Sequence, residues 1–140
     1  MLLDKSMIPE VAVNKMNQIH ETEVEVLNKL YDAIEKYEKG ENSIEEVEKL
    51  FDEFLKDVQE HFSFEQGLME KYNFFAYPMH RGEHDRVLME LTQLKKKFDK
   101  EKNPSLIKSY LSQIFVPWII NHVQTMDTVT AHFLSHFINE

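Results

Sequence analysis

The sequence contains no cysteine, and this absence limits the chemistry available to the protein. It excludes a disulfide framework, an iron–sulfur cluster on the chain's own thiolates, a thiolate zinc site and a cysteine nucleophile. Any metal bound by this chain must therefore be held by imidazole and carboxylate groups. Seven histidines and 25 Asp and Glu residues supply those groups.

Long apolar runs are also missing, since no stretch approaches the roughly 18 apolar residues that a membrane span needs. Met1, Leu2 and Leu3 are followed at once by Asp4 and Lys5, so no signal-peptide core develops. The 25 acidic residues outnumber the 16 Lys and Arg residues, which argues against a nucleic-acid or anionic-membrane surface. We therefore expect a cytoplasmic protein with no nucleic-acid partner and no membrane insertion.

Glycine and proline are scarce, with three and four residues in 140, so the chain has little material for turns. The breaks fall near Pro9, at residues 39–42, at residues 73–78 and at Asn103-Pro104. Ser43-Ile44-Glu45-Glu46 reads as a capping box that opens a helix. Four helices joined by short loops, without alternating strand patterns, predict an all-α, up-down-up-down four-helix bundle, folded as one domain over residues 1–140.

Each predicted helix carries an apolar stripe with steps of three and four residues, the spacing of one helix face. Pro117 interrupts the fourth stripe and predicts a kink or a helix restart one turn before His122. The apolar tail after Thr128 predicts a final helical turn or short helix. The stripes are Val13, Met16, His20, Val24, Leu27, Tyr31 and Ile34; Val47, Leu50, Phe54, Val58, His61, Glu65 and Leu68; His80, His84, Val87, Leu91, Leu94 and Phe98; and Leu111, Phe115, Trp118, His122, Met126 and Val129.

Histidines occur on all four stripes, where an unpaired polar group is costly. A single such histidine is most simply a hydrogen-bonded core residue, but here the group is large. His61 and Glu65, and His80 and His84, are spaced i,i+4 and project from one helix face. His122 and Asp127 are five apart, about 140° around an ideal helix, which suits either a sideways carboxylate or a local irregularity that realigns the pair. His20 adds a fifth imidazole.

Five imidazoles and two carboxylates are too many for one metal ion, since zinc takes four ligands and a facial-triad iron takes three from the protein. Two metals can use all seven if the nitrogens divide three and two and both carboxylates bridge. With one solvent-derived bridge, the first metal has six ligands and the second has five. The open position predicts a site for a small exogenous molecule. His132 and His136 form another i,i+4 pair, which we interpret as surface residues rather than a peripheral metal site.

The order and surroundings of these residues resemble the hemerythrin family, in its single-domain bacterial and archaeal form, the bacteriohemerythrins. The resemblance covers roughly residues 8–138. It is carried by residues 16–20 (Met-Asn-Gln-Ile-His), 61–65 (His-Phe-Ser-Phe-Glu), 80–84 (His-Arg-Gly-Glu-His) and 122–127 (His-Val-Gln-Thr-Met-Asp), with Met69, Tyr77-Pro78 and Trp118-Ile119 beside them. Departures from the family pattern are Ile19 before the first histidine and Pro117 near the fourth helix's ligands.

The resemblance implies a non-haem di-iron centre that binds dioxygen reversibly, for oxygen carriage, storage or delivery, in a binding protein rather than an enzyme. By motif, His80, His84 and His122 would ligate a six-coordinate iron. His20 and His61 would ligate a five-coordinate iron, where oxygen binds. Glu65, Asp127 and an oxo or hydroxo group would bridge both.

Helical spacing puts Phe62, Trp118, Ile119 and Val123 beside the open position, as an apolar pocket lining that would exclude water and favour release of dioxygen. The same residues also suit plain core packing. Alternative functions for the same centre are oxygen or redox sensing and disposal of peroxide or nitric oxide. A purely structural bundle with hydrogen-bonded histidines is the third alternative.

Overall fold

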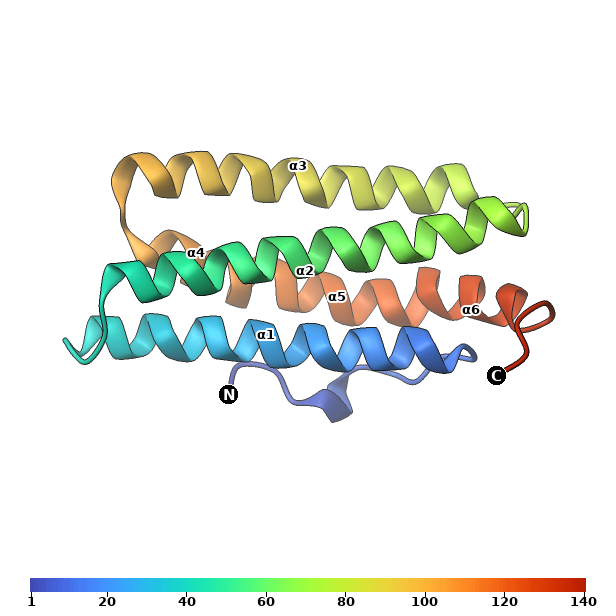
Figure 1. The fold of residues 1–140 in the computed structure, drawn as a ribbon, viewed down its shortest axis with the longest axis horizontal. Coiled ribbons are helices and arrows are strands. Elements are labelled where there is room, and N and C mark those ends of the chain that lie inside the picture. Colours follow the sequence, from blue (N-terminus) through green and yellow to red (C-terminus); the bar gives the residue numbers. More distant parts are fainter.

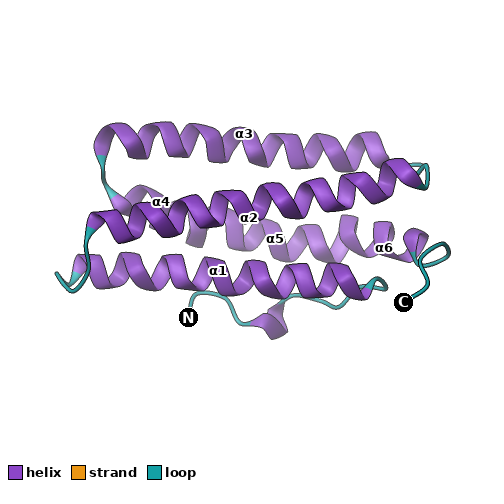
Figure 2. Ribbon diagram, in the orientation of Figure 1, coloured by secondary structure: helices purple, strands orange, loops and turns teal.

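A computed structural model describes all 140 residues, which form helices and connecting loops without a strand (Figures 1 and 2). Successive long helices run antiparallel, and the predicted all-α, up-down-up-down bundle is confirmed. Three of them are uninterrupted: α1 (Asn14–Glu38), α2 (Ile44–Lys71) and α3 (Tyr77–Glu101). The fourth is a series of segments: α4 (Pro104–Tyr110), the π-helical η2 (Leu111–Phe115), α5 (Val116–His122), the π-helical η3 (Val123–Asp127) and α6 (Thr128–Leu134).

The helix ends lie where the turn residues predict them. Gly40 follows α1 with a φ of 75°, a left-handed conformation that glycine adopts without a steric penalty. Ser43 caps α2, since its hydroxyl accepts a hydrogen bond from the Glu46 backbone amide at 3.2 Å. The Asn103 side chain caps α4 by accepting from the Ser105 amide, and Pro104 occupies the first turn, where its missing N–H costs nothing.

The fourth helix changes its hydrogen-bond register twice while its backbone stays helical. In η2 the Val116 amide donates to the Leu111 carbonyl, five residues back, directly before Pro117. This wider turn accommodates a proline that has no N–H and would crowd the carbonyl four residues earlier. The helix restart predicted at Pro117 is thus a change of register without a break. The predicted tail helix is α6, which continues the same axis.

Because of the second π-helical segment, the prediction for one residue of the fourth stripe is wrong. A regular period of 3.6 placed Val129 on the inner face, but its side chain is 51% exposed. The turn through η3 contains an extra residue, so the inner face moves on to Thr130, Ala131 and Leu134, all fully buried. Other predicted stripe residues are buried or lie at the half-buried margin of the core, as Tyr31, Leu50, Leu68, Leu94, Trp118 and Met126 do.

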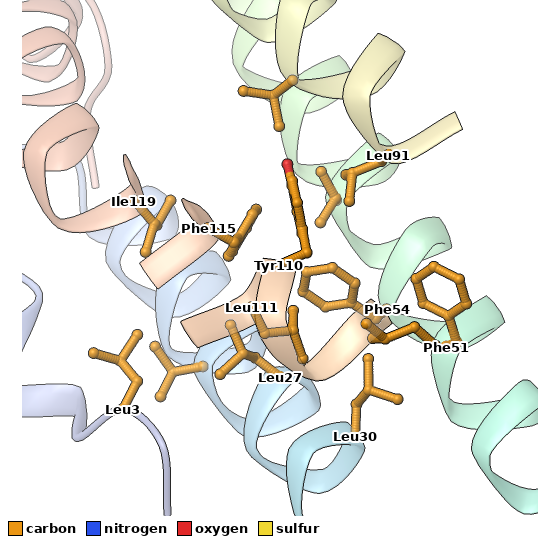
Figure 3. Packing of buried hydrophobic residues seen from close by; sticks show 14 of the residues in the cluster. Leu3, Leu27, Leu30, Phe51, Phe54, Leu91, Tyr110, Leu111, Phe115 and Ile119 are labelled. Atoms are coloured by element: carbon orange, nitrogen blue, oxygen red, sulfur yellow. The ribbon is translucent and has the colours of Figure 1, made fainter. Parts of the chain in front are cut away.

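In the half of the bundle nearest the α1–α2 turn, the rings of Phe51, Phe54 and Phe115 pack among leucine side chains. Figure 3 shows this packing. Phe54 meets Phe115 edge-on at 5.1 Å between ring centroids, and Phe51 meets Phe98 at 5.7 Å. At the other end a smaller apolar cluster joins Val13, Met16, Ala131 and Leu134. The predicted metal-ligating residues lie between these two clusters. No helix of the bundle is both long enough and apolar enough to cross a membrane.

Residues 1–13 precede α1 as an extended arm that runs back along this helix (Figure 1). The arm contains one short 3₁₀ turn, η1 (Lys5–Met7), capped by Asp4. Near its start, Leu3 is only 1% exposed and joins the core beside Leu27 and Ile119. The arm is therefore part of the packed bundle rather than a free tail.

We expect Phe54→Ala to lower the free energy of unfolding by about 3–5 kcal/mol, because it removes a fully buried ring from a close-packed core. Lys97→Ala, on the exposed face of α3, should change it by no more than about 0.5 kcal/mol. Denaturant unfolding of the metal-free protein measures both. Equal losses in the two variants would contradict the assigned core.

Candidate metal centre

All seven residues predicted as metal ligands lie together inside the bundle, and none is more than 2% exposed. Each of the four long helices contributes. His20 comes from α1, and α2 and α3 each present a pair one turn apart. The full set is His20, His61, Glu65, His80, His84, His122 and Asp127.

The pair on the fourth helix is aligned by η3. In an ideal α-helix the five-residue step from His122 to Asp127 would turn the carboxylate well away from the imidazole. A π-helical turn closes over five residues, so the two side chains project to the same side. Asp127 Oδ1 consequently lies 3.2 Å from His122 Nε2. Of the two arrangements that the sequence left open, the structure has the local irregularity.

The ligand atoms form two groups in which all members lie within 4.8 Å of one another. One group contains His80, His84 and His122, and the other contains His20 and His61. Glu65 and Asp127 belong to both groups. The arrangement matches the predicted division of five imidazoles into three and two around a pair of shared carboxylates.

Each shared carboxylate divides its two oxygens between the two groups. Glu65 Oε2 lies 2.7 Å from His61 Nε2 and 3.5 Å from His20 Nε2. Glu65 Oε1 instead faces His84 Nε2 at 3.3 Å and His80 Nε2 at 3.5 Å. A carboxylate placed in this way can bind one metal ion through each oxygen.

Asp127 repeats the pattern from the opposite side of the bundle. Its Oδ2 lies 3.0 Å from His20 Nε2, while its Oδ1 lies 3.1 Å from His80 Nε2 and 3.2 Å from His122 Nε2. The two carboxylates thus span the same pair of imidazole groups. This is the donor arrangement that a two-metal site with two carboxylate bridges requires.

Several of these atoms are buried without any hydrogen-bond partner, which is costly in a protein interior. They include the Nε2 atoms of His20 and His84, Oε1 of Glu65 and both carboxylate oxygens of Asp127. Imidazole nitrogen and carboxylate oxygen are ordinary ligands for iron. The residues present therefore fit a pair of bound metal ions, which would satisfy the unpaired atoms.

Without metal, His20, His61 and His80 hold protons that balance the two buried carboxylates. Burial disfavours charge on His20 and His80, but the attraction of the nearby Asp127 and Glu65 carboxylates outweighs it and raises the pKa of each histidine to about 9. Burial also opposes ionisation of Glu65 and Asp127, yet the surrounding histidines hold the pKa of both carboxyls below their usual values. Metal binding must displace those protons.

Three histidines make a hydrogen bond through Nδ1 that directs Nε2 toward the site. His61 Nδ1 donates to Glu23 Oε2 at 2.8 Å, His80 Nδ1 donates to Thr130 Oγ1 at 2.7 Å, and His84 Nδ1 donates to Gln66 Oε1 at 3.1 Å. Such outer partners fix the orientation of metal-binding imidazoles.

Sequence reasoning did not identify these partners, although two carried a signal. Glu23 is a charged residue three positions after His20, on the inner face of α1, and is 2% exposed. Gln66 follows Glu65 directly. Nothing in the sequence indicated Thr130, because a regular helical period does not place it on the inner face of the helix. The π-helical turn brings it to that face.

The four residues predicted to line an oxygen pocket have different surroundings. Phe62 stacks on His84, with ring centroids 3.9 Å apart, and Trp118 stacks on His122 at 4.5 Å. Val123 is buried in the main core. Ile119 borders a small cavity of about 10 Å³ beside His20, roughly the room of one water-sized molecule, with a wall made mostly of buried side chains.

That cavity lies on the side of the two-histidine group. Its wall is mainly apolar, formed by Leu3, Ile8, Val24, Leu27, Phe115 and Ile119, with His20 and Glu23 completing it. The four residues predicted to line this pocket are all apolar or aromatic, whereas the structure also places the Glu23 carboxylate in the cavity wall. One of its oxygens accepts the hydrogen bond from His61.

His132 and His136 lie outside both ligand groups, and their side chains are exposed. Their rings are 5.3 Å apart, edge to face. No carboxylate joins them in a group of three or more potential ligands.

Comparison with known proteins agrees with this geometry. Residues 11–134 match the family described as hemerythrin HHE cation binding domain. The chain is 38% identical over 134 residues to the bacteriohemerythrin of Aquifex aeolicus (strain VF5), which covers 96% of this chain and 98% of that protein. It is 25% identical over 116 residues to the bacteriohemerythrin of Methylococcus capsulatus (strain ATCC 33009 / NCIMB 11132 / Bath), which covers 83% of each.

The fold comparison points the same way. A crystal structure of a hemerythrin mutant superposes with a TM-score of 0.78 and 23% identity, covering 96% of this chain and 97% of the other. The family match spans most of the chain, including all seven buried ligand candidates. This protein belongs to the hemerythrin family, as a bacteriohemerythrin-like chain with a cation-binding domain.

Proposed function

We propose that this protein binds dioxygen reversibly at a non-haem di-iron centre and serves oxygen carriage, storage or delivery. One observation carries the proposal. Glu65 and Asp127 each divide their oxygens between a three-histidine and a two-histidine group, and a small, mainly apolar cavity adjoins the two-histidine group. The two-histidine group would provide one ligand fewer to a metal ion, and it is this group that the cavity adjoins.

In this proposal His80, His84 and His122 would hold one iron, His20 and His61 would hold the other, and Glu65 and Asp127 would be shared by the two. Bound iron would supply the electrons for reversible uptake of dioxygen. Five neutral imidazoles and two carboxylates make a site with few anionic ligands, which gives little stabilisation to the high-valent iron of oxidation catalysts. The donor set therefore favours binding over turnover.

The chain's own residues supply the conditions for reversal. Leu27, Phe115 and Ile119 exclude water from the cavity, which restricts the protons needed to convert bound oxygen into free peroxide. Glu23 accepts the Nδ1–H of His61 and holds its Nε2 toward the site. Trp118 and Phe62 stack on His122 and His84 and limit the motion of these rings.

Exposure of the anaerobically reduced, iron-loaded protein to dioxygen tests the proposal. We expect a visible charge-transfer band that appears with dioxygen and disappears when the gas is removed, over repeated cycles. Rapid conversion to the diferric form without that band would contradict reversible binding and favour a redox or detoxification role.

Ligand substitution should separate the buried histidines from the exposed pair. We expect His122→Ala to lose most of the bound iron and the oxygen-dependent band, because it removes one of three imidazoles from its group. His132→Ala should retain about two irons per chain and the band, since His132 lies outside the centre. Iron analysis and the visible spectrum measure both, and iron content that is equal in the two variants would exclude His122 as a ligand.

The hydrogen bond between Glu23 and His61 gives a further prediction. Glu23→Gln should weaken iron affinity by about 10-fold or more, because it removes the buried charge that orients and strengthens the imidazole. Glu53→Gln, on the exposed face of α2, is the matched control for loss of one carboxylate. Competition with a chelator measures both affinities, and equal values would show that Glu23 does not support the site.

Proton displacement predicts a pH dependence. In the metal-free protein His20 and His80 have pKa values of about 9, so both are protonated near neutral pH. Iron(II) affinity should therefore rise between pH 6.5 and 8.5. The raised pKa values stabilise the metal-free fold fully below pH 6.5, and this contribution is lost as the pH rises through 9. Anaerobic chelator competition and thermal unfolding of the metal-free protein measure the two trends, and an affinity that falls with pH would contradict the assignment.

A further inference from the structure

A surface groove and the small cavity beside His20 share part of their walls. The groove, of about 420 Å³, lies between residues 5–10 of the arm and α1. Ile8, His20 and Val24 line both the groove and the cavity. The side chains of Ile8 and Val24, next to the His20 imidazole, thus separate the surface groove from the cavity beside the two-histidine group.

The arm is fixed to α1 at both ends of this groove. The Asn28 side chain accepts from the amides of Leu2 and Leu3, at 3.0 Å each, and donates to the Leu3 carbonyl at 2.7 Å. The Asn17 side chain accepts from the Val11 amide at 2.8 Å and donates to the Val11 carbonyl at 2.9 Å. These anchors hold Leu3 in the wall of the cavity and determine where the arm crosses α1.

Between the anchors the arm is held more weakly. The hydrogen bonds of residues 4–8 are local to the arm, and the polar contact to α1 is the exposed ion pair of Lys5 with Glu25 at 2.6 Å. Exposed ion pairs contribute little to stability. Ile8 is half-buried in this stretch, whereas Val24 is part of a helix. A segment with few tertiary bonds opens at a low free-energy cost, so Ile8 is the movable part of the wall.

We propose that residues 4–10 of the arm form the entrance through which dioxygen reaches the centre, with Ile8 as the side chain that opens and closes it. The identity of the entering molecule rests on the proposed function. Ile8 and Val24 present a branched apolar constriction, while Lys5, Glu10 and Glu21 face the outer groove. An apolar constriction passes dioxygen more readily than water or anions, so the same residue slows autoxidation.

Ile8→Ala in the iron-loaded protein tests the gate, with Met7→Ala as the control. Met7 is the preceding residue, is 52% exposed and lines neither the groove nor the cavity. We expect Ile8→Ala to raise the association and dissociation rates of dioxygen together by about fivefold, with faster autoxidation and little change in equilibrium affinity. Rates equal to those of Met7→Ala, with reversible binding intact, would overturn the proposal.

A second measurement does not depend on oxygen binding. In the metal-free, full-length protein at about pH 9, where a large share of His20 is neutral, an acylating reagent that modifies neutral imidazoles reports access to His20, with the exposed His132 and His136 as internal references. Ile8→Ala should raise the rate at His20 by about threefold or more relative to the references, and Met7→Ala should not. An unchanged rate at His20 would exclude the entrance, whereas loss of the oxygen band in the unmodified chain would contradict only the proposed function.

Discussion

The structure depends on two carboxylates that are completely buried among imidazoles. Glu65 and Asp127 are 0% exposed, and an ionised carboxylate at that depth needs cationic partners. Without metal, protonated histidines supply the positive charge, and with metal the ions replace those protons. The same interactions fix the relative positions of four helices, since Glu65 contacts histidines of α1, α2 and α3 and Asp127 contacts histidines of α1, α3 and the fourth helix.

The rest of the bundle isolates this polar centre from water. Aromatic packing around Phe54 and Phe115 fills one end, and the cluster of Met16 and Leu134 fills the other. The arm adds Leu3 to the wall that faces the two-histidine group. The side chains that accept hydrogen bonds from the Nδ1 atoms of the ligating imidazoles are Glu23, Gln66 and Thr130. The remaining surroundings are mainly apolar, and an apolar environment strengthens the electrostatic interactions between the buried carboxylates and their partners. These surroundings support the proposed binding of a small uncharged molecule that is released unchanged.

Much of this arrangement could be predicted from the sequence, and the failures have physical causes. The spacing of His61 with Glu65 and of His80 with His84 follows from the regular helical period, so these pairs were predictable. The π-helical turn that aligns His122 with Asp127 contains one residue more than a regular turn, and a regular helical period cannot predict it. The same extra residue explains why Val129 is exposed and Thr130 is buried. Leu3 and Ile8 lie far from the ligands in sequence, and their place on the cavity wall depends on the side chain of Asn28 and the course of the arm.

In the proposed centre, one set of seven side chains holds two metal ions that share both carboxylates. Anomalous diffraction at the iron absorption edge, from crystals of the iron-loaded protein, would locate these ions. We expect two separate maxima inside the bundle, one beside His20 and His61 and one beside His80, His84 and His122, with Glu65 and Asp127 contacting both. A single maximum, or iron bound elsewhere with the buried cluster empty, would contradict the proposed centre.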